Sequence, residues 1–154
     1  MMGLLDFIFG KQIKLKNEFF GTMLFLEDKN DSLKSYFECR RHFKPSNEII
    51  EIGLEGEKIG PTQKQIDFFK SIENNYSRIT KAISPLIEDE FGNWQEGFKI
   101  DNFRKEFEPV YLKLPRCEIK PVVWEISFES QHDRNYTITL FMSDFDPNEI
   151  SIDG

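Results

Sequence analysis

Two cysteines and two histidines are the side chains of this sequence whose types could support nucleophilic or metal chemistry. Cys39 and His42 have the spacing of half a zinc-binding motif, whereas Cys117 and His132 stand alone in the sequence. A structural zinc ion takes four convergent ligands, and a catalytic cysteine needs a histidine beside it. Because residues three apart in an alternating strand point to opposite faces, Cys39 and His42 cannot converge without a bulge or a turn. We therefore predict no catalytic cysteine, no metal site and two free thiols.

Two acidic motifs match metal-binding patterns only in part. His132 and Asp133 form the dipeptide of metal-dependent phosphohydrolases, but those enzymes need further His and Asp ligands on helices. The segment 144–148 begins like a calcium loop, D-x-D-x-N, yet its sixth position is Glu149 instead of the required glycine. Both segments are rich in turn-forming residues, so we predict turns there. Neither a phosphate-binding glycine loop nor a G-x-S-x-G motif occurs, so we predict no cofactor and no catalytic residues.

Acidic residues beside a tryptophan are the strongest candidate for a partner-binding surface. The group comprises Glu88, Asp89 and Glu90 near the end of a predicted helical block, and Trp94 and Glu96 in the glycine-flanked loop that follows. Loop aromatics often anchor protein partners. Two alternatives stay open: the acidic run is a solvated helix face, and Trp94 folds back to cover the core.

Periodicity predicts three strands in the first third of the chain. Residues 19–26 form a nearly continuous apolar run, and residues 33–43 and 50–54 alternate between apolar and polar side chains. Turn-forming clusters separate these runs, which favours an antiparallel meander. The preceding residues, 1–17, consist of an apolar decapeptide and a basic connector that could form an N-terminal arm.

The strongest prediction is a helix that begins after Thr62. Thr62 and Gln65 have the spacing of a capping box, in which each side chain caps the other residue's backbone N–H. A stripe at spacings of three and four follows: Ile66, Phe69, Ile72, Tyr76, Ile79 and Ile83. Ser84-Pro85 either kinks this helix or starts a second one. Asp101 could cap a further short helical turn.

Alternating segments at 110–114, 122–128 and 136–142 predict three more strands, the last two as a hairpin, and residues 149–152 could add a short one. The order is therefore βββ-α-(α)-βββ. We predict one α+β domain spanning residues 1–154. Its mostly antiparallel sheet has about six strands, with a long helix packed on one face.

Charge narrows the choice of partner. The chain carries 27 acidic and 20 basic side chains, a formal net charge of −7. A surface of this sign repels phosphate backbones and attracts basic proteins, so we expect a basic protein partner and no nucleic acid. Negative charge also serves solubility alone, and that alternative stays open. Arg40 and Arg41 face opposite ways in an alternating strand and form no coherent basic patch.

Composition and the opening residues indicate a cytoplasmic protein. Residues 1–10 are apolar but too short to span a bilayer, and they lack a basic leader and a cleavage site. We therefore expect no membrane association and a reducing compartment. The 16 phenylalanines could build a core or an aromatic binding surface, and most fall on the predicted buried faces, which favours the core.

Several short motifs together resemble a known group of proteins. They are Phe20-Gly21 in an early strand, Gly60-Pro61-Thr62 with Gln65 at a helix start, Tyr76 in the long helix, Trp124 to Phe128, and the terminal Ile152-Asp153-Gly154. The sequence resembles small acidic single-domain bacterial proteins of unknown function, some of whose relatives are thought to be immunity proteins encoded beside secreted toxins. The resemblance implies a binding role and no catalytic residues.

Three functions remain at this point. The sequence favours a non-enzymatic protein-binding domain, and the resemblance makes an immunity protein that neutralises a basic toxin the specific case. The first alternative is an enzyme whose site is assembled only in the fold. The second is a structural or homo-oligomeric module joined through a sheet edge or the N-terminal arm. The sequence specifies neither the oligomeric state nor the strand order.

Overall fold

One sheet of eight strands runs through the computed structural model, which describes residues 13–154. The strands are β1 (Ile13–Asn17), β2 (Gly21–Leu26), β3 (Tyr36–Phe43), β4 (Glu48–Glu55), β5 (Phe107–Leu114), β6 (Val123–Ser130), β7 (Thr137–Ser143) and β8 (Asp146–Asp153). They lie side by side in the order of the sequence. Every neighbouring pair is antiparallel except β4 and β5, which are parallel. The sheet thus consists of two antiparallel meanders that meet at one parallel pair.

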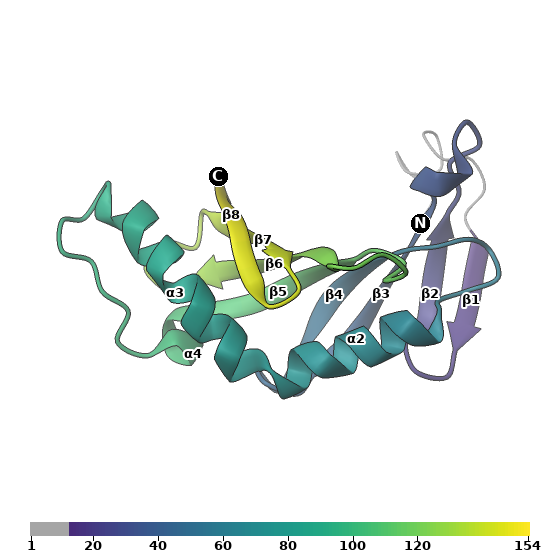
Figure 1. The fold of residues 1–154 in the computed structure, drawn as a ribbon, viewed down its shortest axis with the longest axis horizontal. Helices are drawn as coiled ribbons and strands as arrows, with labels where there is room; N and C mark the ends of the chain where they lie inside the picture. The colour runs from purple at the N-terminus through teal and green to yellow at the C-terminus, as the bar shows by residue number, and fades with distance from the viewer. Residues whose placement is uncertain (1–12) are drawn as a thin grey trace.

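Helices occupy the connection between the two meanders, because a parallel pair needs a long crossover. They are α2 (Gln63–Asn74), α3 (Tyr76–Gly92) and the short α4 (Phe103–Glu106); one turn of 3-10 helix, η1 (Ser32–Lys34), connects β2 to β3. Figure 1 shows α2 and α3 running end to end along one side of the sheet. Within residues 13–154, no helix is long and apolar enough to cross a membrane.

The predicted helix start and its buried stripe are confirmed. The Thr62 hydroxyl accepts a hydrogen bond from the Gln65 backbone at 3.1 Å, and the Gln65 side chain accepts one from the Thr62 backbone at 2.9 Å. Gln65 is itself fully buried, and its Nε2 donates to Glu55 O at 2.7 Å and to Pro115 O at 2.9 Å. One side chain therefore ties the start of α2 to the ends of both parallel strands.

The helical block divides at Asn75, within the stretch predicted as one helix, and not at Ser84-Pro85, where a second helix was one of the two alternatives. Asn75 has φ −110° and ψ 17°, and its side-chain Nδ2 donates to the Ser71 carbonyl at 2.8 Å, which ends α2. Pro85 lies inside α3. It is exposed and so is Lys81, whose carbonyl loses its helical donor, so water can satisfy that carbonyl. The short helix α4 is capped by Asn102, where the sequence suggested Asp101.

The fold is α+β with a mostly antiparallel sheet, as predicted, but the sheet has more strands than the six we expected. Residues 13–17, assigned to an N-terminal arm, form the edge strand β1, which pairs with β2 from Ile13↔Phe25 to Asn17↔Gly21. The remainder of that predicted arm, residues 1–12, lies outside the described residues. At the other edge, β8 begins at Asp146 and is longer than the predicted strand over 149–152.

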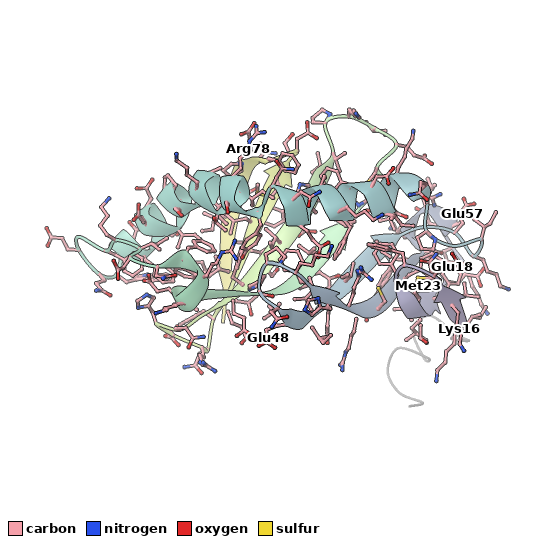
Figure 2. All side chains as sticks on the ribbon, turned by 90° about the horizontal axis from the view of Figure 1, so that it is seen from below. Lys16, Glu18, Met23, Glu48, Glu57 and Arg78 are labelled. Atoms are coloured by element: carbon pink, nitrogen blue, oxygen red, sulfur yellow. The ribbon has the colours of Figure 1, made fainter. Side chains whose placement is uncertain are left out.

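Alternation gives the sheet two unlike faces. One row of side chains on each strand packs under the helices, with Phe37, Ile52, Leu112, Ile126 and Leu140 all fully buried. In Figure 2, α2 and α3 run across the upper part of the view with strands of the sheet below and behind them, and Arg78 points outward from α3. The helices therefore cover one face, and the side chains of the alternate row lie on a face that they do not cover.

Candidate binding site on the uncovered sheet face

The cysteines lack the environment of a nucleophile. Burial raises the pKa of the Cys39 thiol to about 12 although Arg41 is nearby, and burial with Glu55 raises that of Cys117 to about 12. Both thiols are therefore protonated at neutral pH, when the thiolate is the reactive form. His42 lies on the opposite face of β3, where its Nε2 is 2.8 Å from Asn47 Oδ1. Cys39 and His42 do not converge.

His132 pairs with a glutamate that belongs to the framework. Its Nε2 lies 2.8 Å from Glu106 Oε1, and the other Glu106 oxygen accepts from the backbones of Asp101 and Asn102. Burial raises the pKa of Glu106, but the hydrogen bonds from the Asn102 backbone and from His132 outweigh it and lower that pKa. The pair joins the β6–β7 turn to the start of α4, and Asp133 is not part of it.

The calcium-like segment is a structural turn. Asp144 adopts φ 49°, its carboxylate accepts from Val122 N at 2.9 Å, and its carbonyl accepts from Trp124 Nε1 at 2.6 Å. These bonds fix the β7–β8 turn to the start of β6. Within residues 13–154, no three His, Cys, Asp or Glu side chains lie close enough together to hold a metal ion.

The structure exposes Trp94 at the end of α3. Its side chain is 65% exposed and stacks on Tyr136, with centroids 6.3 Å apart and planes 26° apart. Its ring also lies 5.7 Å, centroid to centroid, from that of the buried Phe91, so the alternative that Trp94 folds back to cover the core is met only in part. Asp89 and Glu96 are exposed nearby, and Glu90 is partly exposed.

Glu88 does not belong with this exposed group. Its Oε2 accepts from the Ile100 backbone at 2.9 Å, and its Oε1 lies 3.8 Å from Lys99 Nζ. The Glu88 side chain is mostly buried, and its bonds hold the loop that follows α3 in place. The structure thus keeps four of the five residues of the predicted partner-binding surface accessible and assigns the fifth to the framework.

A second surface, which was not among the sites predicted from the sequence, lies on the uncovered face of the sheet. Acidic side chains on this face outnumber basic ones. By strand alternation and cross-strand pairing, the acidic residues are Glu38, Glu51, Glu55, Glu108, Glu125, Glu129, Glu149 and Asp153, and the basic residues are Lys14, Lys16, Arg40 and Lys113. The face therefore has the net sign of the whole chain.

Three hollows on this face meet at one residue, Tyr111. The first, of about 400 Å³, lies between η1 and the centre of the sheet and is also lined by Glu38 and Gly53. The second and third, each of about 530 Å³, are also lined by Glu51, and Tyr111 borders them too. Tyr111 therefore borders all three hollows, which are together called the Tyr111 groove here. The groove comprises the surfaces that line these three hollows.

Gly53 explains how Tyr111 lies in the groove. Gly53 pairs with Glu38 on β3 and with Lys113 on β5, so it occupies a middle position of the uncovered face. A Cβ atom at this position would collide with the Tyr111 hydroxyl. The absence of a side chain therefore lets the tyrosine ring lie across β4.

Glu38 differs from Glu51, a second carboxylate of the groove, and from Glu125, whose partner Lys113 lines the groove. Glu51 is paired with Arg40 at 3.3 Å, and Glu125 is paired with Lys113 at 3.6 Å. Within the part of the chain that the structure describes, Glu38 makes no hydrogen bond or ion pair through its carboxylate. Burial and then the charge of Glu51 raise its pKa. Burial, followed by the charge of Glu38, raises the pKa of Tyr111 to about 12.

Searches among protein-family models, curated proteins and solved structures find no match to this chain. The resemblance to immunity proteins therefore stays a prediction. One sequence signal pointed toward the groove: Gly53 interrupts a strand of large side chains, and a glycine inside a strand often marks a close approach by another group. The identity of that group, Tyr111, required the pairing of β4 with β5.

Proposed function

We propose that this chain is a non-enzymatic protein-binding domain whose uncovered sheet face receives a basic partner protein. The observation that carries the proposal is the face itself: the helices leave it uncovered, carboxylates dominate it, and three hollows meet at its centre. A central aromatic residue surrounded by polar and charged groups is a common composition of protein interfaces.

Charge supports a basic partner. With a net charge of −7, the whole chain attracts a positively charged protein at long range, and carboxylates on the docking face orient the encounter. A toxin domain with a basic surface is one partner of this chemistry, and the resemblance of the sequence to immunity proteins favours it. The hollows are open to solvent along the sheet, which suits a protein surface better than a reaction that must exclude water.

Charge reversal on two different surfaces tests the proposal. The first variant carries Glu55→Lys, Glu129→Lys and Glu149→Lys, which lie on the uncovered face and whose carboxylates have no polar partner among residues 13–154. The second carries Asp89→Lys, Glu90→Lys and Glu96→Lys around Trp94, and alters the same number of charges. Each tagged protein is mixed with lysate of the host at low salt, and the proteins it retains are identified.

The expected result is a basic protein that binds the wild type and the Trp94-side variant, but not the sheet-face variant. Elution at high salt is expected because the attraction is largely electrostatic. The purified partner must then reproduce this order of affinities. Equal retention by all three proteins, or loss only in the Trp94-side variant, contradicts the assignment to the uncovered face.

A further inference from the structure

Glu38 occupies an unfavourable position on the uncovered face. It is partly buried, it lies beside the like charge of Glu51, and neither lysine that lines the first hollow forms an ion pair with it. Of those two lysines, Lys113 is already paired with Glu125, and Lys34 is exposed on η1. Glu38 also lines the second hollow, where Arg40 is already paired with Glu51 and Lys14 forms no ion pair within residues 13–154. A carboxylate removed from water without a cation raises the free energy of the folded protein. A cation supplied by a partner would relieve this cost.

Tyr111 supplies the second half of a cation site. Its ring lies across Gly53, and Gly53 is the direct cross-strand neighbour of Glu38. Aromatic faces attract cations, and the attraction strengthens when water is displaced. A guanidinium is planar, stacks on aromatic rings and donates in parallel to carboxylate oxygens, whereas an ammonium acts as a compact, strongly hydrated point charge. A ring beside a carboxylate therefore fits arginine better than lysine.

We propose that Tyr111, held across Gly53 beside Glu38, receives one arginine side chain of the basic partner, whose guanidinium pairs with the Glu38 carboxylate. This inference rests on the proposed function, and it names the contact at the centre of the docking face. Glu55 lines the same hollow and has no ion pair within residues 13–154, so it offers the arginine a second carboxylate.

The first test uses two synthetic decapeptides, one alternating arginine with serine and the other alternating lysine with serine. Each is titrated into the ¹⁵N-labelled full chain, and backbone amide shifts are followed by NMR. The arginine peptide is expected to shift the amides of Gly53, Glu38 and Tyr111 most. Its affinity is expected to exceed that of the lysine peptide by at least about threefold.

Substitutions then separate the ring from the charge. Tyr111→Ala is expected to weaken the arginine peptide about tenfold, and Glu38→Gln by about threefold or more. Tyr111→Phe keeps the ring and serves as the matched control, with affinity close to that of the wild type. Thermal unfolding of each variant establishes that it is folded at the temperature of the titration.

The outcomes keep this inference separate from the proposed function. If Tyr111→Ala and Glu38→Gln bind the arginine peptide as the wild type does, the inference is overturned. The proposed function survives that result if the sheet-face variant with Glu55→Lys, Glu129→Lys and Glu149→Lys still loses the peptide. If none of these variants alters peptide binding, or if the wild type binds neither peptide, both proposals are contradicted.

Discussion

The two faces of the sheet are built from the same strands, yet they follow different constraints. On β4, Ile50, Ile52 and Leu54 face the helices and are at most 1% exposed, whereas Ile49, on the other face, is 62% exposed. The first row must be apolar because it forms the core with α2 and α3. The second row is not needed for the core, so its charges and its central glycine are free to serve another role. That difference is why we assign stability to one face and binding to the other.

Removal of a ring from the covered face should have the largest effect. Phe69 on α2 is fully buried and contacts the rings of Phe19, Phe20 and Phe43 at centroid distances of 5.7, 5.9 and 6.1 Å. Phe69→Ala is expected to lower the free energy of unfolding by about 3–5 kcal/mol, measured by urea denaturation. A loss below about 1 kcal/mol would contradict the view that this face carries the stability.

Removal of a buried polar side chain on the covered side should have the second-largest effect on the free energy of unfolding. Gln65→Ala leaves the carbonyls of Glu55 and Pro115 without their donor and is expected to cost about 2–3 kcal/mol. Gln63→Ala is the matched control, because Gln63 is exposed and, among residues 13–154, its side chain bonds only Asp67; a change within about 0.5 kcal/mol is expected. Equal losses in the two variants would show that the buried contacts of Gln65 are not what stabilises this junction.

Glu106 gives a smaller effect that depends on pH. Its folded-state pKa is lowered, so its ionised form stabilises the fold above the pKa of the unfolded chain, and that stability is lost as pH falls through the folded-state pKa. Glu106→Gln is expected to lose about 1–2 kcal/mol at pH 7 and progressively less as the pH is lowered through that window. Urea denaturation at several pH values provides the test. An equal loss at every pH would contradict this linkage.

Substitution of Glu38 should change the stability in the opposite direction to substitution of Glu106. The folded-state pKa of Glu38 is raised, so the charge destabilises the fold once the pH is above that value, and the penalty disappears in acid. Glu38→Gln is expected to raise the free energy of unfolding at pH 7 by less than about 1 kcal/mol, because the group is only partly buried. Denaturation at neutral and acidic pH compares it with Glu106→Gln. A clear loss of stability at pH 7 would mean that Glu38 supports the fold instead of serving a partner.

Local patterns allowed part of this structure to be predicted. Thr62 and Gln65 are close in sequence, and the stripe from Phe69 to Ile83 needs only helical periodicity, so both were predicted correctly. Strand β1 was missed because five residues with two lysines resemble a connector until β2 supplies the pairing partner. The break at Asn75 depends on a side-chain bond that competes with the helix, and the proline nearby was the stronger local signal.

The candidate site was harder to predict from the sequence than these elements. Trp94 stacks on Tyr136, which lies far away in the chain, and the groove depends on the register that brings Tyr111 onto Gly53. Alternation identified which side chains share a face and which row is apolar, but not which strands lie side by side. These contacts join residues far apart in the chain, and a single sequence does not reveal them.

The central claim is that the uncovered face binds and the Trp94 end does not. The most direct test is the affinity of the purified basic partner, measured by calorimetry, for the wild type and the two charge-reversed variants. The sheet-face variant carries Glu55→Lys, Glu129→Lys and Glu149→Lys, and the Trp94-side variant carries Asp89→Lys, Glu90→Lys and Glu96→Lys. The account predicts that the sheet-face variant binds the partner at least tenfold more weakly than the Trp94-side variant, a difference of ~1.4 kcal/mol in binding free energy. The reverse order, or equal affinities, would contradict it.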